Sequence, residues 1–116
     1  MNCKINNNRD TVEIVINYED AYISGIYDKN TEELGILDLY VPGRIRGRGI
    51  GTNLVKSIVK KCYDNYDLKL ITLDDMSDRH RERNNIYTKM GFYYCDYWGP
   101  EMSIRASRFM RFNNLL

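Results

Sequence analysis

The sequence is poor in the residues that build disulfide frameworks and metal centres. Its three cysteines, Cys3, Cys62 and Cys95, are an odd number, lie far apart and form no C-x-x-C pair. Together with the single histidine, His80, they do not supply a convincing zinc site. We therefore expect free thiols, buried or incidental, and no bound metal.

Long apolar runs and a large net charge are missing too. No stretch approaches the roughly 20 apolar residues that cross a bilayer, and residues 1–8 lack the apolar stretch of a secretory signal. We therefore expect an intracellular, cytoplasmic protein with no membrane partner. The net charge of +1 argues against a protein whose main role is to coat nucleic acid.

The residues that are present suit one globular domain. Of the 116 residues, 43% are hydrophobic and 28% are charged, as in an ordinary globular protein rather than a disordered one. A domain of this size buries roughly two-thirds of its unfolded surface, which is enough to fold without metals or disulfides. We expect a single domain over residues 1–116.

Hydrophobic patterning in the first half predicts strands followed by a helix. β-Branched residues with partial alternation predict strands over residues 11–18, 21–27 and 34–41, the first two forming a hairpin. From Ile50 the apolar residues follow a helical period, and this amphipathic helix should end near Tyr63.

The second half alternates between the two kinds of element. We expect an apolar strand over 68–73, a helix in the later part of 76–90 capped by Gly91, an aromatic strand over 92–98 and a last strand over 102–109. This order predicts an α/β (α+β) fold, with a mixed, mostly antiparallel sheet around a central parallel β-α-β unit.

A glycine-rich segment, residues 39–52, joins the third strand to the first helix. The first N–H groups of a helix have no partner within it, and the helix dipole makes that end positive. Glycines leave these N–H groups unshielded, so a diphosphate can approach the backbone. Arg46 and Arg48 add positive charge nearby. Taken alone, such a turn can also be a tight connection without a ligand.

Other glycine-rich motifs do not fit this segment. The Rossmann pattern G-x-G-x-x-G fails because Gly47 and Gly49 are followed by Thr52, and Gly49 and Gly51 by Leu54. A Walker P-loop would need Gly-Lys-Ser/Thr. Arg-Gly-Arg-Gly occurs in disordered RNA-binding segments, but there it is repeated and no apolar helix follows.

Arg46-x-x-Gly49-x-Gly51 resembles the Gln/Arg-x-x-Gly-x-Gly/Ala motif of the GNAT superfamily of N-acetyltransferases. In that family the backbone of this turn holds the pyrophosphate of coenzyme A. The preceding strand pairs with the pantetheine arm and orients the acetyl carbonyl. The resemblance assigns acetyl-CoA binding to Leu39, Tyr40, Val41, Arg46, Gly47, Arg48, Gly49, Ile50, Gly51 and Thr52.

A second match lies one helix and one strand further on. Residues 85–92 are similar to the Tyr-x-Lys-x-Gly-Phe ending of the family's second CoA-binding helix. By this resemblance Tyr87 is the general acid for the departing thiolate, and Asn84 belongs to the cofactor-binding residues. A phenol with a pKa near ~10 can protonate a thiolate whose conjugate acid lies near ~8.5. The alternative is that Tyr87 only packs its helix on the sheet.

The residues before Tyr87 depart from the family's pattern. The family often has an Asn seven residues earlier, where this chain has His80. His80 is therefore either a cofactor ligand or a solvated surface side chain. Likewise Arg79, Arg81 and Arg83 either meet the coenzyme's 3′-phosphate or form a solvated charged face.

The attacking amine must be neutral, so a carboxylate or a chain of waters has to take its proton. Asp38 is our first candidate, because strand periodicity puts it on the same face as Tyr40 in a mostly apolar strand. Glu33, Asp74 and Asp75 are further candidates. An ordered water relay without one essential carboxylate is the alternative.

The acceptor is not named by the sequence. Family members of usual size carry a helix pair near the N-terminus that helps to cover it, and this chain has too few residues before Thr11 for such a pair. We expect an open acceptor site, or one completed by a second subunit in a homodimer. Tyr93, Tyr94, Tyr97 and Trp98 either line that site or face the core.

These observations predict an N-acetyltransferase that passes the acetyl group of acetyl-CoA to a primary amine on a small molecule or peptide. Direct attack is expected because no cysteine or serine has an evident activating base. One alternative is a module that binds acyl-CoA without turnover. Another is nucleic-acid recognition through arginine clusters at residues 44–48, 79–83 and 105–111.

Overall fold

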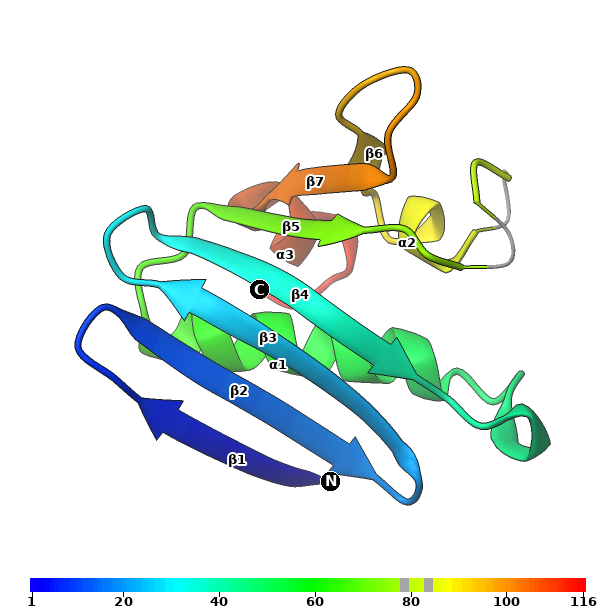
Figure 1. Ribbon diagram of the computed structural model, residues 1–116, viewed down its shortest axis with the longest axis horizontal. Helices are drawn as coiled ribbons and strands as arrows, with labels where there is room; N and C mark the ends of the chain where they lie inside the picture. The colour runs from blue at the N-terminus through cyan, green and yellow to red at the C-terminus, as the bar shows by residue number, and fades with distance from the viewer. Residues whose placement is uncertain (78–79, 83–84) are drawn as a thin grey trace.

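A mixed β-sheet forms the centre of the structure, a computed structural model that describes residues 1–77, 80–82 and 85–116 (Figure 1). The strand order is β1-β2-β3-β4-β5-β7-β6. The strands are β1 (Asn2–Asn7), β2 (Thr11–Tyr18), β3 (Ala21–Asp28), β4 (Glu33–Tyr40), β5 (Leu70–Asp74), β6 (Tyr93–Tyr94) and β7 (Glu101–Arg105). The helices are α1 (Ile50–Asn65), α2 (Ile86–Lys89) and α3 (Ala106–Phe112), and a 3-10 turn spans Gly43–Ile45.

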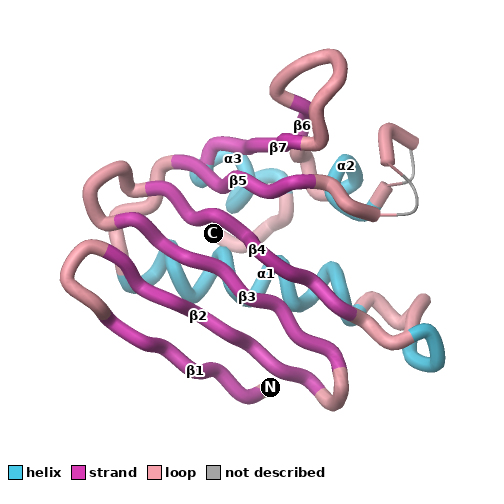
Figure 2. Tube along the Cα trace, viewed as in Figure 1, coloured by secondary structure: helices cyan, strands magenta, loops and turns pink. Residues whose placement is uncertain are grey.

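Neighbouring strands run antiparallel except at one place. β4 and β5 are parallel and are joined through α1, so the predicted central β-α-β unit and mixed, mostly antiparallel sheet are confirmed. Figure 2 shows α1 running behind β2, β3 and β4.

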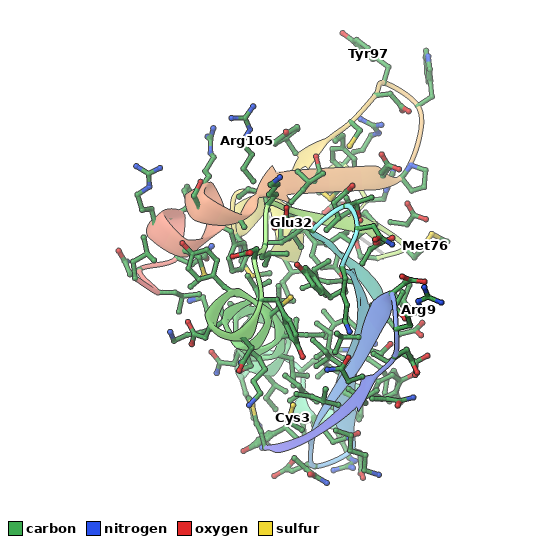
Figure 3. The ribbon with its side chains drawn as sticks, turned by 90° about the vertical axis from the view of Figure 1, so that its left-hand side faces the viewer. Cys3, Arg9, Glu32, Met76, Tyr97 and Arg105 are labelled. Carbon is green, nitrogen blue, oxygen red and sulfur yellow. The ribbon has the colours of Figure 1, made fainter. Side chains whose placement is uncertain are left out.

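One face of the sheet carries the core and the helices. Alternation along β2 and β3 turns Val12, Ile14, Ile16 and Ile23 toward α1, whose buried stripe includes Leu54. The side view in Figure 3 shows α1 and α3 on the same side of the sheet. In the described part of the chain, no helix covers the opposite face.

The first three predicted strands, now β2, β3 and β4, and the first helix match the sequence predictions closely, and β5 lies close to the strand expected over 68–73, while the elements after α2 differ. The last strand was expected over 102–109, but β7 ends at Arg105 and α3 follows it directly. Ala106, Phe109 and Met110 are buried at the spacing i, i+3, i+4 of a helix face, and this period overrides the apparent alternation.

Two further elements differ from expectation. The aromatic strand predicted over 92–98 is reduced to Tyr93–Tyr94, because an Asx turn at Asp96 bends the chain into a loop. The edge strand Asn2–Asn7 was not predicted. All six of its residues are exposed, so no hydrophobic alternation marks it.

The unexpected helix α3 should contribute strongly to stability. Phe109 is fully buried and packs edge-to-face on Phe92, with ring centroids 5.7 Å apart. We predict that Phe109→Ala lowers the free energy of unfolding by about 3–5 kcal/mol in urea titrations followed by circular dichroism. The neighbouring exposed change Arg108→Ala should cost under about 0.5 kcal/mol. Equal effects of the two changes would contradict this packing.

Candidate active site

The candidate site begins where β4 separates from β5. These strands pair only from Glu33 to Ile36, against Leu70 to Leu73. At this point the register between β3 and β4 shifts, because Ser24 pairs with Asp38 and Gly25 with Ile36. Leu37 is thus the extra residue of a β-bulge, and it is 60% exposed. A bulge bends its strand and ends regular pairing, so the rest of β4 diverges from β5 (Figure 1).

A pocket of about 660 Å³ occupies this divergence. The predicted site residues that line it are Asp38, Leu39, Val41, Arg46, Gly47, Gly49, Ile50, Gly51, Thr52 and Tyr87. Tyr40 and Arg48 are exposed and do not line it. Tyr40 instead lies beside Tyr22 on the uncovered face of the sheet. Asn84 lies outside the described residues.

The glycine turn presents backbone N–H groups to this pocket. Gly47 and Gly49 have φ angles of 82° and 77°, in the left-handed region that favours glycine, and Gly49 is the N-cap of α1. Asn53 is the first residue to donate back into the helix, to the Gly49 carbonyl at 3.0 Å. The N–H groups of Ile50, Gly51 and Thr52 therefore have no acceptor within α1.

The charge at this turn favours an anion. No acidic residue occupies the first turn of α1, and no side chain caps it. Arg46 stabilises the turn by donating from Nε to the Val41 carbonyl at 2.8 Å, while the residue also lines the pocket. A helix N-terminus with free N–H groups and a nearby guanidinium is suited to a phosphate or diphosphate.

Gly51 lets α1 and α2 approach each other closely. A Cβ at this position would lie 3.0 Å from Ile86 Cδ1 and 3.5 Å from Val41 Cγ2. A larger residue would therefore require the Ile86 side chain to shift. The last glycine of the turn sets the spacing of the two helices rather than a backbone conformation.

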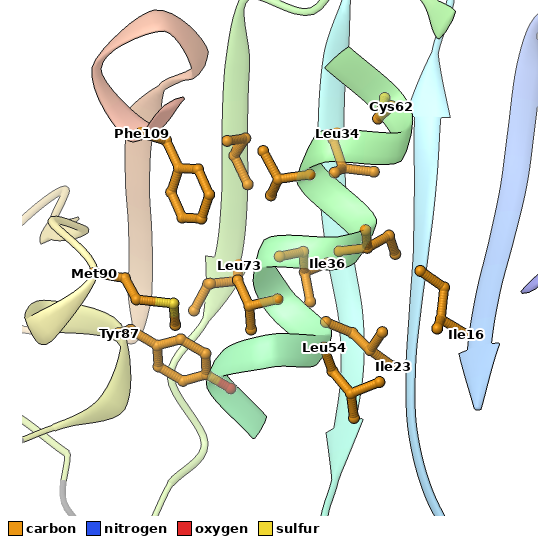
Figure 4. Close-up of a cluster of buried hydrophobic side chains, with 14 of the residues drawn as sticks. Ile16, Ile23, Leu34, Ile36, Leu54, Cys62, Leu73, Tyr87, Met90 and Phe109 are labelled. Atoms are coloured by element: carbon orange, nitrogen blue, oxygen red, sulfur yellow. The ribbon is translucent and has the colours of Figure 1, made fainter. Parts of the chain in front are cut away.

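Tyr87 lies between the core and the pocket. It is 9% exposed, and its ring packs edge-to-face on Phe92. Figure 4 shows its hydroxyl directed toward the first turn of α1. Burial, and secondarily the charge of Asp75, raise the pKa of Tyr87 to about 12. The phenol is therefore held in its protonated form.

The carboxylates proposed as bases fall into separate environments. Asp38 and Asp74 are both exposed and line the pocket. Ser24 Oγ donates to Asp38 Oδ2 at 3.5 Å. Glu33 lies at the opposite end of β4 and does not line the pocket. Asp75 is buried at 2% exposure, so it is not accessible to an acceptor.

A buried polar cluster around Asp75 was not anticipated from the sequence. Asp75 accepts hydrogen bonds from Ser77, Asn85 and Tyr94. His80 Nδ1 lies 3.3 Å from Asp75 Oδ2, so His80 borders this cluster. The signal that could have indicated it is weak: an aspartate after a buried strand and an asparagine before a short helix.

Arg81 and the four aromatic candidates at residues 93–98 do not line the pocket. Arg81 Nη2 donates to the carbonyls of Asp96 and Gly99, and its guanidinium stacks on Tyr94 at 4.3 Å. Arg81 thus holds the β6–β7 loop, while Arg79 and Arg83 lie outside the described residues. Tyr97 and Trp98 are 84% and 92% exposed and, like Tyr93 and Tyr94, do not line the pocket.

The three cysteines lie outside the pocket. Burial raises the pKa of the Cys62 thiol to about 12, and none of the three cysteines lines the pocket. Among the described residues, no group of three or more His, Cys, Asp or Glu side chains could hold a metal ion. None of the described helices has both the length and the apolar character needed to cross a bilayer.

Comparison with known families decides the identity of the fold. The sequence profile of the Acetyltransferase (GNAT) family matches residues 7–92, which is most of the chain. The chain belongs to the GNAT acetyltransferase family. No curated protein sequence matches this GNAT protein.

Solved structures share the GNAT fold at low sequence identity. Ard1 from Thermoplasma volcanium is 22% identical with a TM-score of 0.62, over 80% of this chain and 69% of that one. Tetrahymena GCN5 is 18% identical with a TM-score of 0.61, over 85% and 70% of the two chains. A chimera of a spermidine N-acetyltransferase from Vibrio cholerae is 12% identical with a TM-score of 0.67, over 90% and 74% of the two chains.

The family assignment agrees with the expected superfamily and makes the protein an acyltransferase. The matched region includes the glycine turn and extends through Tyr87 to Phe92. Both quoted motifs therefore lie within the region that the family profile covers.

The raised pKa of Tyr87 gives a direct test of the pocket's environment. In ¹³C-tyrosine NMR, we predict that the Tyr87 Cζ resonance starts to shift only as the pH approaches about 12, against ~10 for a solvated phenol. Since unfolding frees this group to ionise at ~10, its contribution to stability is present below that pH and is lost as the pH rises toward 12. The resonance that disappears in Tyr87→Phe is the one that belongs to Tyr87. Ionisation near ~10 would mean an open, solvated hydroxyl.

Proposed function

We propose that this GNAT protein transfers the acetyl group of acetyl-CoA to a primary amine by direct attack, and that residues 1–116 form one catalytic domain. The observation that carries the proposal is one pocket bordered by the free N–H groups of α1, the edge of β4 that does not pair with β5, and Tyr87. A non-catalytic acyl-CoA-binding module is the second candidate. It is favoured by the direct turn from β1 to β2, which has no helix to cover the acceptor.

The pocket supports a position for each part of the coenzyme. The diphosphate would bind the N–H groups from Gly47 to Thr52, with Arg46 alongside. The pantetheine arm would run along β4 beyond Ile36, where β4 no longer pairs with β5. There its amides can form strand-like hydrogen bonds with Leu39 and its neighbours.

The acceptor would enter from the uncovered face of the sheet. Strand alternation turns Asp38 and Asp74 to that face, whereas Leu39 and Tyr87 lie on the helix face, and all four line the same pocket. The pocket therefore reaches both faces. An amine arriving from the open side meets the thioester of a coenzyme bound from the helix side, and Asp38 or Asp74, directly or through water, takes its proton.

In the transfer step, the amine nitrogen attacks the thioester carbonyl carbon and a C–N bond forms as the C–S bond breaks. The sulfur takes a proton from the Tyr87 hydroxyl, and the proton lost by the amine passes through the base to the solvent. Tyr87 regains a proton from the solvent once CoA has left. With a pKa of about 12, Tyr87 stays protonated at neutral pH. Full transfer to a solvated thiolate of pKa ~8.5 is uphill by about 3–4 pKa units. The mechanism therefore requires a poorly solvated sulfur, whose pKa burial also raises.

Relatives support an amine as the acceptor without naming it. One structural neighbour is a spermidine N-acetyltransferase and another is a nourseothricin acetyltransferase. These names state what those two proteins act on, not what this chain acts on. The two exposed carboxylates at the pocket, Asp38 and Asp74, are compatible with an acceptor that carries positive charge.

Release of free CoA with a panel of amines tests the proposal. The panel comprises polyamines, aminoglycosides, lysine peptides and peptide N-termini. We predict that Tyr87→Phe lowers kcat with the best acceptor by about 10²–10⁴-fold, while the Kd for acetyl-CoA stays within about threefold. Calorimetric binding with no thiol release from any amine would favour the binding module. An unchanged kcat in Tyr87→Phe at every pH would remove Tyr87 from the chemistry.

A further inference from the structure

The helix that carries Tyr87 is too short to hold its own position. α2 has only four residues, Ile86–Lys89, and a single turn has little stability in isolation. Its first N–H groups are satisfied by Asn85, whose Oδ1 accepts from the N–H of Tyr87 at 2.7 Å and of Thr88 at 3.3 Å. The orientation of Asn85 therefore governs the start of α2 and the direction of Tyr87.

The opposite side of the same amide is fixed by a buried carboxylate. Asn85 is fully buried, and its Nδ2 donates to Asp75 Oδ2 at 2.9 Å and to Ser77 Oγ at 3.0 Å. An amide can bind both partners at once only with its nitrogen toward Asp75 and its oxygen toward α2. Asp75 thus sets which way round the Asn85 amide lies.

Asp75 is itself held by donors from three segments. Its Oδ1 accepts from Ser77 N–H at 3.0 Å and Ser77 Oγ at 2.6 Å, and its Oδ2 accepts from Asn85 and from Tyr94 of β6. Its backbone N–H donates to the Pro100 carbonyl at 2.8 Å. Burial raises the pKa of Asp75, but the hydrogen bonds from Ser77 and Tyr94 outweigh it and hold the pKa below its usual range. The side chain does not line the pocket.

We propose that Asp75 is a positioning residue for the transfer reaction: through Asn85 it aligns the one-turn helix α2 and so directs the Tyr87 hydroxyl into the pocket. This inference rests on the proposed function of Tyr87. Because Asp75 does not line the pocket, it would touch neither cofactor nor acceptor. Its ionised carboxylate only accepts hydrogen bonds, so no arrangement with the Asn85 nitrogen turned away satisfies it equally well.

The isosteric change Asp75→Asn tests this role. It puts an NH₂ group in the cluster that can face the NH₂ of Asn85, and the Asn85 amide can relieve the conflict by turning its oxygen away from α2. We expect kcat to fall about 10- to 100-fold, because a misplacement near 1 Å costs that much. The Kd for acetyl-CoA should stay within about threefold. Asp96→Asn is the matched control, since Asp96 holds an exposed turn that Asn also forms, and kcat should not change.

An exchange of the two residues separates positioning from simple loss of stability. In Asp75→Asn/Asn85→Asp the new amide donates to the new carboxylate, which caps α2 as well as asparagine does. We expect kcat to return to within about fivefold of the wild type. If Asp75→Asn alone does not fold, the variant with both residues exchanged still tests the proposal. A folded exchange variant with kcat as low as that of Asp75→Asn would overturn the proposal.

A double-mutant cycle shows whether Asp75 acts through Tyr87. Adding Asp75→Asn to Tyr87→Phe should lower kcat by less than about twofold further, and fully additive losses would overturn the proposal. Hydrogen exchange of the Tyr87 and Thr88 amides reports on α2 independently of catalysis. If Tyr87→Phe has no effect on kcat, Tyr87 is not the general acid. Faster hydrogen exchange of the Tyr87 and Thr88 amides in Asp75→Asn would then still support the positioning of α2 by Asp75. Unchanged exchange in that variant overturns it.

Discussion

The site depends on the divergence of β4 from β5. Parallel pairing holds these strands together over only four residue pairs, up to Ile36 and Leu73. The bulge at Leu37 then shifts the register of β4 against β3, and β4 does not pair with β5 beyond this point. Had pairing continued, the backbone of residues 38–40 would be occupied by β5 and no pocket would exist there. Asp38, Leu39, Tyr87 and the glycine turn border this opening, so the bulge is the constraint on which the account of function rests.

The opening joins two different environments. On the helix face, the N-terminus of α1 and the buried phenol of Tyr87 line the pocket where we propose that the anionic coenzyme binds. On the uncovered face, Asp38 and Asp74 are exposed to solvent. This division suits a reaction in which one partner is held firmly and the other arrives from solution. On the helix side, Gly51 lies close to Ile86, and a buried polar cluster surrounds Asp75.

Short-range patterns in the sequence predicted the parts of the fold that they control. Alternation of apolar and polar residues predicted β2 and β3, and the apolar stripe from Ile50 predicted α1, which follows the glycine turn. Failures came where a longer-range contact decides. α3 forms because Phe109 packs on Phe92, and β1 is held by backbone pairing with β2 rather than by its side chains.

The site residues likewise fall into those that short-range sequence patterns indicate and those that depend on longer-range contacts. The residues of the glycine turn and Tyr87 could be chosen from motifs, because local backbone geometry and a helix end carry their chemistry. The bulge at Leu37 has no sequence signature of its own. The role of Asp75 depends on Asn85 and Tyr94, 10 and 19 residues away. Asp75 could therefore be noticed as a carboxylate, but not recognised as buried.

Calorimetric titration of coenzyme A into Gly49→Asp and Gly43→Asp tests the central claim most directly. Aspartate tolerates a left-handed N-cap, so Gly49→Asp should fold, but it puts a negative charge where the diphosphate should bind. Gly43→Asp adds the same charge in open space outside the pocket. The account predicts a Kd raised at least about tenfold by the first change and within about threefold of wild type for the second. Equal affinities in the two variants would contradict it.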